Sequence, residues 1–176
     1  MRQADASSVR APGSLYTLIA LMAERLDTAD AVAAAKWTTG DRGVGSAIAD
    51  PAREAEVYGT VARLGSGSDL PETWVRQIFF SQIEASKTVQ LGLMLRWRFD
   101  RAEAPVDAVD LASVRSVIDR VNIEILAQLR ARRAELIAPD CVEQLARSVF
   151  SVFAAGWGDT LHRVALVRAV IALCPA

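Results

Sequence analysis

The segment Ala23–Trp37, "AERLDTADAVAAAKW", is rich in alanine, and this composition favours an α-helix. Arg25 and Lys36 lie eleven residues apart in it, which is three helical turns to within about 20°. Both cations therefore extend from the same face of the helix. Only two of the twenty basic residues of the chain are lysines, so the choice of lysine at position 36 calls for a chemical reason.

The overall composition points to a helical globular protein. The 176 residues fit one domain, or two tightly merged halves, and 52% are hydrophobic while only 6% are aromatic. Alanine, leucine and valine dominate, which favours helices over sheets. The net charge of −1 gives no reason to expect nucleic acid or an anionic membrane as a partner. No apolar run approaches the roughly 18 residues of a membrane span.

Helical periodicity and turn signals predict an all-α fold, a single bundle of about six helices. Asp50 before Pro51 is typical of a helix start, Asp110 is a second capping residue, and Asp69 with Glu72 forms a capping-box pattern. A glycine-rich loop separates the first two helices. The expected helices cover residues 14–37, 51–64, about 69–99, 111–137, 139–155 and 160–173.

Several polar side chains occupy positions where the helical period predicts core. They are Arg25 and Lys36 in the first helix, Gln82, Ser86 and Gln90 in the third, and Arg115 and Asn122 in the fourth. Arg53 and Glu54 stand at the start of the second helix, beside the loop. Buried polar groups cost a few kcal/mol when unpaired, so these residues either satisfy one another, reach the surface, or bind a ligand.

An anionic ligand is the economical partner, because we expect few carboxylates on the same faces. Arginine side chains grip carboxylates with two parallel hydrogen bonds, whereas a lysine supplies a compact point charge. This difference explains a lysine at position 36 in an arginine-rich chain. The pattern predicts a helical bundle with an interior pocket for an anion, and by itself it identifies no reaction.

The two cysteines, Cys141 and Cys174, allow two interpretations. Two free buried thiols would suit a cytosolic protein. A disulfide would tie down the C-terminus and, by closing a 33-residue separation, could stabilise the fold by roughly 3–4 kcal/mol. We favour the disulfide, and with it an oxidising compartment.

Other features have ordinary structural explanations. His162 is the only histidine, and a surface or capping role is expected for it. The arginines of Arg130–Arg133 are typical of a solvated helix end, where they suit the helix dipole. No cysteine–histidine cluster supports a metal site. The tryptophans are expected to pack, with Trp37 bracing the helix of Lys36.

The ordered series "ERL", "KW", "DPARE", "QIEASKTVQ" and "LASVRSVIDRVN" resembles chorismate mutase of the all-α class. The two cysteines and the extra C-terminal helices resemble its secreted (gamma) subclass. The resemblance covers residues 15–174 and implies a cofactor-free rearrangement of chorismate to prephenate. It also implies a periplasmic or secreted protein whose signal peptide has been removed, since the start "MRQADASSVRAPG" has no hydrophobic signal core. The relatives suggest a homodimer.

The resemblance also assigns residues. Lys36 and Gln90 correspond to the donors to the ether oxygen of the substrate. The substrate-binding residues that it implies are Arg25, Asp50, Arg53, Glu54, Ser86 and Arg115. In the small dimeric relatives an arginine equivalent to Arg115 comes from the partner subunit, and here we expect the chain to supply its own.

The domain organisation follows from these assignments. We expect residues 1–13 to be a disordered N-terminal segment and residues 14–176 to form the mutase domain. Within it, 14–99 supply most of the site and 110–176 form the C-terminal helices.

Three features of the sequence depart from the pattern of the family. Some secreted relatives carry glutamate where Gln90 stands, and some carry glutamine where this chain has Val57. The loop between Lys36 and Arg53 is longer than in some relatives. The alternative function is a non-catalytic helical domain that binds a small carboxylate, and a purely structural bundle is the third.

Overall fold

A computed structural model describes residues 13–39, 48–65 and 70–175 of the chain. Within these ranges the chain forms seven α-helices and one short 3-10 helix, and it contains no β-strand. The elements are α1 Tyr16–Thr38, α2 Pro51–Gly65, α3 Glu72–Phe99, η1 Arg101–Glu103, α4 Leu111–Ala131, α5 Arg133–Leu136, α6 Cys141–Ala154 and α7 Thr160–Val170. The all-α prediction is confirmed. In the described part of the chain, no helix combines the length and the apolar character that crossing a bilayer requires.

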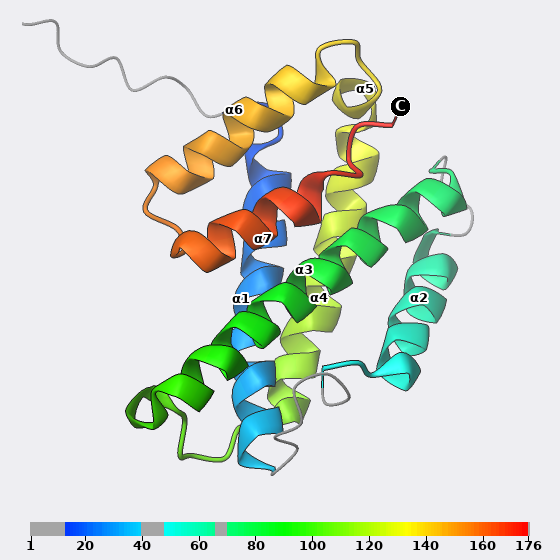
Figure 1. The fold of residues 1–176 in the computed structure, drawn as a ribbon. Coiled ribbons are helices and arrows are strands. Elements are labelled where there is room, and N and C mark those ends of the chain that lie inside the picture. Colours follow the sequence, from blue (N-terminus) through cyan, green and yellow to red (C-terminus); the bar gives the residue numbers. More distant parts are fainter. Residues whose placement is uncertain (1–12, 40–47, 66–69, 176) are drawn as a thin grey trace, which may run out of the picture.

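α1 is the central element of the bundle. It packs mainly against α4 and α3, while α7 lies along α3 and α6 also contacts α1 (Figure 1). α2 stands at one side of the bundle and contacts α3 and α4 (Figure 1). Leu18, Ile19 and Met22 of α1 are completely buried in the core. This arrangement leaves the C-terminal half of α1 facing α3 and the start of α2.

The predicted helix starts are confirmed at two of three places. A side-chain oxygen of Asp50 accepts a 3.0 Å hydrogen bond from the backbone N–H of Arg53. Asp110 accepts a bond of the same length from the backbone N–H of Ala112. The residue before α3 is Pro71, which has no side-chain acceptor to offer. Asp69, the expected capping residue there, lies outside the described residues.

The predicted helix 111–137 is wrong in one respect, because the chain breaks at Arg132 into α4 and α5. Arg132 has φ −107° and ψ 15°, outside the usual helical range. After the break, Leu136 of α5 is fully buried. Burial of this leucine is the packing gain that accompanies the interruption of the helix.

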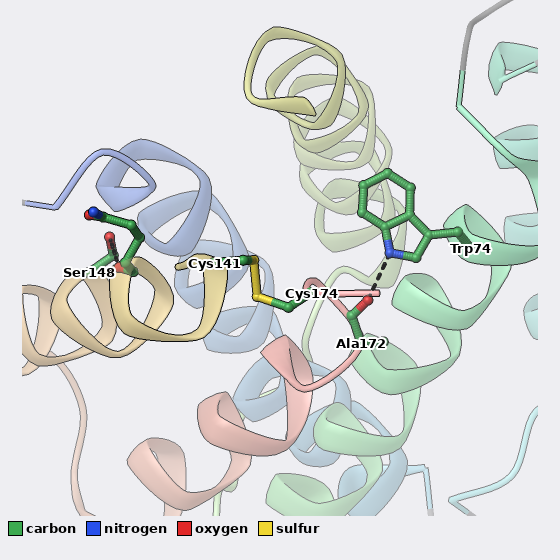
Figure 2. The surroundings of a disulfide bond; sticks show 6 residues. Trp74, Cys141, Ser148, Ala172 and Cys174 are labelled. Carbon is green, nitrogen blue, oxygen red and sulfur yellow. Dashed lines mark hydrogen bonds between the residues drawn. A yellow bond between two sulfur atoms is a disulfide. The ribbon is translucent and has the colours of Figure 1, made fainter. Parts of the chain in front are cut away.

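The C-terminus is tied to the bundle by a disulfide between Cys141 and Cys174, whose Cα atoms are 5.9 Å apart. The bond joins the start of α6 to the segment after α7 (Figure 2). Close to it, the indole N–H of Trp74 donates a 2.9 Å hydrogen bond to the carbonyl of Ala172, which fixes the same segment to α3 (Figure 2). The disulfide predicted from the sequence is therefore present.

His162 is buried, which corrects the expectation of a surface position. It lies in the first turn of α7 with 8% of its surface exposed. Its Nδ1 is 2.8 Å from Asp159 and its Nε2 is 2.8 Å from Asp30 of α1. Asp159 also caps α7, since it accepts a hydrogen bond from the backbone N–H of His162. The histidine therefore joins α7 to α1 through Asp30, while Asp159 holds its other ring nitrogen from the start of α7.

Candidate active site

α1, α2, α3 and α4 enclose a cavity of about 140 Å³. All eight residues expected to bind or act on a ligand line its wall: Arg25, Lys36, Asp50, Arg53, Glu54, Ser86, Gln90 and Arg115. Apolar side chains such as Val32, Val57 and Ile83 fill the wall between them. Positions separated by up to ninety residues in the sequence thus share one site.

A hydrogen-bonded series joins α1 to α3 across the cavity. The ammonium group of Lys36 donates to Oε1 of Gln90 at 3.1 Å and to the carbonyl of Ile48 at 2.9 Å. The amide nitrogen of Gln90 in turn donates to the hydroxyl of Ser86, one helical turn earlier, at 3.1 Å. Gln90 is 5% exposed, and these two hydrogen bonds orient its amide. The contacts place the nitrogen atoms of Lys36 and Gln90 in one part of the wall.

Arg25 is a buried cation with a neutral partner. It is 5% exposed, and its Nε donates to the amide oxygen of Asn122 on α4 at 2.8 Å. Burial and the positive charge of Arg53 lower the pKa of Arg25 to about 10, although the Asp119 carboxylate opposes the change. A guanidinium that loses water and pairs with a neutral amide retains most of its capacity to attract an anion.

Arg53 is paired with carboxylates, in contrast to Arg25. The expectation that few carboxylates lie around the site is therefore wrong. One terminal nitrogen donates to Glu56 at 3.0 Å and the other to Asp119 of α4 at 2.8 Å. Burial alone would lower the pKa of Arg53, but these hydrogen bonds raise it. Asp119 was missed in the sequence because its position on α4 faces α2 only after the two helices pack.

The start of α2 brings two carboxylates to the wall. One side-chain oxygen of Asp50 caps α2 and so fixes the first turn of that helix at the cavity wall. Glu54 forms a 2.7 Å ion pair with Lys87 of α3. Lys87, the second lysine of the chain, also lines the cavity, and the sequence pattern did not single it out. Its place three residues before Gln90, which puts both on one face of the helix, was the available signal.

Of the polar residues predicted on the inner faces of the helices, Arg115 is exposed and Gln82 lies away from the cavity. Arg115 lines the cavity but is exposed, so it stands at the rim and not on a buried stripe. Gln82 is buried but does not line the cavity, and its amide donates to the carbonyl of Ala169 on α7 at 3.2 Å. Gln82 therefore forms a hydrogen bond between α3 and α7, and its amide is satisfied within the protein instead of by a ligand.

Trp37 braces the end of α1, as expected. Its ring makes an edge contact with Trp97 of α3, with centroids 5.6 Å apart. The guanidinium of Arg101 lies 5.8 Å from the centroid of the Trp37 ring, the range of a cation–π contact. The neighbouring Lys36 is thus carried by a helix end that is packed against α3.

Fold and cavity together define an all-α protein with a cation-rich internal pocket. The family model described as "Chorismate mutase type II" matches residues 16–91, which contain α1, α2 and most of α3. The secreted chorismate mutase of Mycolicibacterium smegmatis is 32% identical over 160 residues, covering 91% of this chain and 86% of that protein. The secreted chorismate mutase of Mycobacterium tuberculosis is 30% identical over 169 residues, covering 95% and 82%.

Solved structures agree with these relatives. The crystal structure of chorismate mutase from Burkholderia phymatum superposes with a TM-score of 0.82 at 34% identity, covering 92% of this chain and 96% of that one. That from Burkholderia thailandensis gives 0.79 at 32% identity, covering 91% and 98%. The chain belongs to the chorismate mutase family, and it is an enzyme of the isomerase class.

Proposed function

We propose that the cavity binds chorismate and converts it to prephenate without a cofactor. Chorismate is a dicarboxylate whose reactive form folds its enolpyruvyl arm over the ring. The observation that carries the proposal is that Arg25, Arg53 and Arg115 surround one cavity together with Lys36 and Gln90. Three arginines suit two carboxylates, and a lysine with an amide suits a single oxygen atom on which charge develops.

The arginines are proposed to hold the folded substrate. Arg25 is positioned by Asn122, and Arg53 by Asp119, so both guanidinium groups are oriented before a ligand arrives. Ser86 would add a hydroxyl donor to one carboxylate. Holding both ends of the molecule in the reactive conformation removes much of the entropic barrier of the rearrangement. Because Arg115 belongs to the same chain, each chain would supply a complete site.

Lys36 and Gln90 are proposed to stabilise the transition state. As the C–O bond breaks, negative charge grows on the ether oxygen, and donors that are already in place stabilise it without reorganisation. The amide nitrogen of Gln90 carries two N–H donors, of which the bond to Ser86 uses one. Glu54 would accept a hydrogen bond from the hydroxyl of the substrate ring. This mechanism involves no nucleophile and no proton transfer.

The test is the loss of chorismate absorbance after purified full-length protein is added. Arg53→Ala should lower kcat/KM by at least about a hundredfold, since a charged hydrogen-bonding partner of a carboxylate is lost. Absence of activity in the unmodified protein would refute the proposal. The alternative, a carboxylate-binding domain without catalysis, predicts binding of chorismate with no turnover.

For the location, we propose an oxidising compartment outside the cytoplasm. The disulfide Cys141–Cys174 supports this, and the two mycobacterial relatives are named as secreted proteins. Alkylation of thiols in protein isolated from its native host, with and without reductant, tests the proposal. Labelling without reductant would contradict it.

A further inference from the structure

Lys87 lies on the cavity wall beside Ser86, and none of the proposed steps uses it. Its ammonium nitrogen is 2.7 Å from Oε1 of Glu54 on α2 and 2.9 Å from Oε1 of Glu84 on its own helix. About a quarter of each of the three side chains is exposed, so the cluster stands where the cavity meets the surface. The role of Lys87 therefore depends on its contacts with these two carboxylates.

The two carboxylates balance the positive charge of Lys87. Burial alone would lower its pKa, but the hydrogen bonds to Glu54 and Glu84 raise it, so the ammonium group stays protonated. Arg25 is the contrasting case, because its hydrogen bond goes to the neutral amide of Asn122. The ammonium group of Lys87 has three N–H donors and directs two of them to these carboxylates, whereas the guanidinium of Arg53, which also meets two carboxylates, has five donors and keeps others for a substrate. Lys87 is therefore less suited than Arg53 to hold the substrate itself.

α2 depends on polar contacts for its position. Its buried side chains are Val57 and Val61, which form a small apolar face. The side chain of Arg76 on α3 stacks 5.0 Å from the centre of the Tyr58 ring, but this contact is one turn further from the cavity. The ion pair with Lys87 is therefore the contact that sets where Glu54 stands relative to α3.

Lys87 is also linked to α7, through Glu84. Glu84, the second carboxylate on Lys87, also accepts a hydrogen bond from Arg168 of α7 at 3.3 Å. The sequence Glu54, Lys87, Glu84 and Arg168 thus runs from α2 across α3 to α7. Lys87 is held between Glu84, which is linked to α7, and Glu54, which lines the cavity.

We propose that Lys87 is a positioning residue, which holds Glu54 at the cavity wall so that it accepts the hydroxyl of the substrate. The inference rests on the proposed chorismate mutase function and adds a residue to it. Without the ammonium group, Glu54 turns toward water and α2 loses its fixed distance from α3 at the site. Because the hydroxyl contact exists in both ground state and transition state, its loss raises KM more than it lowers kcat.

The experiment compares initial rates of chorismate loss for the unmodified chain, Lys87→Met and Lys87→Arg. Lys87→Met should raise KM about tenfold and change kcat less than about threefold, the scale of one charge-assisted hydrogen bond. Lys87→Arg, which keeps both ion pairs, should recover most of the loss. The matched control is Arg120→Met, since Arg120 also lies between two carboxylates, Glu24 and Glu124, but does not line the cavity. Its KM should stay within about twofold.

A double-mutant cycle with Glu54→Gln separates positioning from direct binding. If Lys87 acts through Glu54, adding Lys87→Met to Glu54→Gln should change KM by less than about twofold. Independent, multiplying effects would show that Lys87 contacts the substrate and would overturn the inference. An active unmodified enzyme whose KM is insensitive to Lys87→Met would also overturn it. An inactive unmodified enzyme would instead refute the proposed function, so the two failures are distinguishable.

Discussion

The ammonium nitrogen of Lys36 lies 3.1 Å from the amide oxygen of Gln90, although 54 residues separate them in the chain. The contact fixes the glutamine with its oxygen toward the lysine and its nitrogen toward Ser86. The two nitrogen donors are thereby held in one region of the cavity before a ligand binds. This pair is the centre of the proposed transition-state stabilisation.

The Lys36→Met variant should therefore lose activity through kcat. A donor that strengthens its contact only as charge develops contributes to kcat more than to KM, and removal of one such donor costs about 10² to 10³ in kcat. Steady-state kinetics with chorismate measure both constants. If KM alone rose while kcat held, Lys36 would be a ground-state binding residue.

The second prediction concerns the pH dependence at Gln90. An amide donates hydrogen bonds at any pH, so kcat of the unmodified enzyme should be nearly flat from about pH 5 to 8. Gln90→Glu should make activity fall with rising pH, because a glutamate donates only when protonated and its ordinary pKa is about 4.3. A steep loss of activity in the unmodified enzyme between pH 5 and 7 would contradict the role of Gln90.

Asn122 should control the orientation of Arg25. Asn122→Ala removes the acceptor of the 2.8 Å hydrogen bond from Nε, and the buried guanidinium is then free to turn within the cavity. KM for chorismate should rise about tenfold, the scale of a hydrogen bond to a charged group. A lower melting temperature with an unchanged KM would mean that Asn122 serves stability alone.

Removal of the disulfide should lower stability and leave the chemistry intact. Cys174→Ser opens a loop of 33 residues, and the chain-entropy model gives a loss of about 3–4 kcal/mol. Thermal unfolding in the absence of reductant should show a lower melting temperature for the variant than for the unmodified chain. With reductant present the two should converge. The cysteines do not line the cavity, so kcat at 25 °C should be retained.

His162 should make stability depend on pH. Burial alone would lower its pKa, but the hydrogen bonds to Asp159 and Asp30 raise it, so the folded state binds the proton more tightly than the unfolded state. This contribution is complete below the ordinary histidine pKa of about 6.5 and is lost as the pH rises through the higher folded value.

The pH dependence at Asp159 has the opposite sign. Hydrogen bonds from the backbone and the side chain of His162 lower the pKa of Asp159 to about 2, so the stabilisation from this carboxylate is present above its ordinary pKa and is lost in strong acid.

The variant His162→Gln should destabilise the fold more at pH 5.5 than at pH 8.5, by roughly 1–3 kcal/mol at the lower pH. Urea unfolding at the two pH values measures this. Equal losses at both would show that the charge on His162 does not matter.

Local patterns predicted the helices and the polar side chains on their inner faces. Periodicity located α1, α2 and α3 to within a few residues, and Asp50 and Asp110 were recognised as caps because capping uses neighbouring residues only. The interruption of the helix at Arg132 was missed. It is accompanied by the burial of Leu136, and burial depends on packing between helices. Gln82 and Gln90 shared one sequence pattern, yet one contacts α7 and the other lines the cavity.

Residue order alone was enough to predict a helical protein that carries cations and amides on the inner faces of its helices, and two cysteines near its C-terminal end. The partner of each cation is known from the packing of the helices: an amide for Arg25, two carboxylates for Arg53, and Glu54 with Glu84 for Lys87. The reason is physical. Helical periodicity is set by bonds between residues three to five apart, whereas ion pairs and burial depend on distances between helices that only packing fixes.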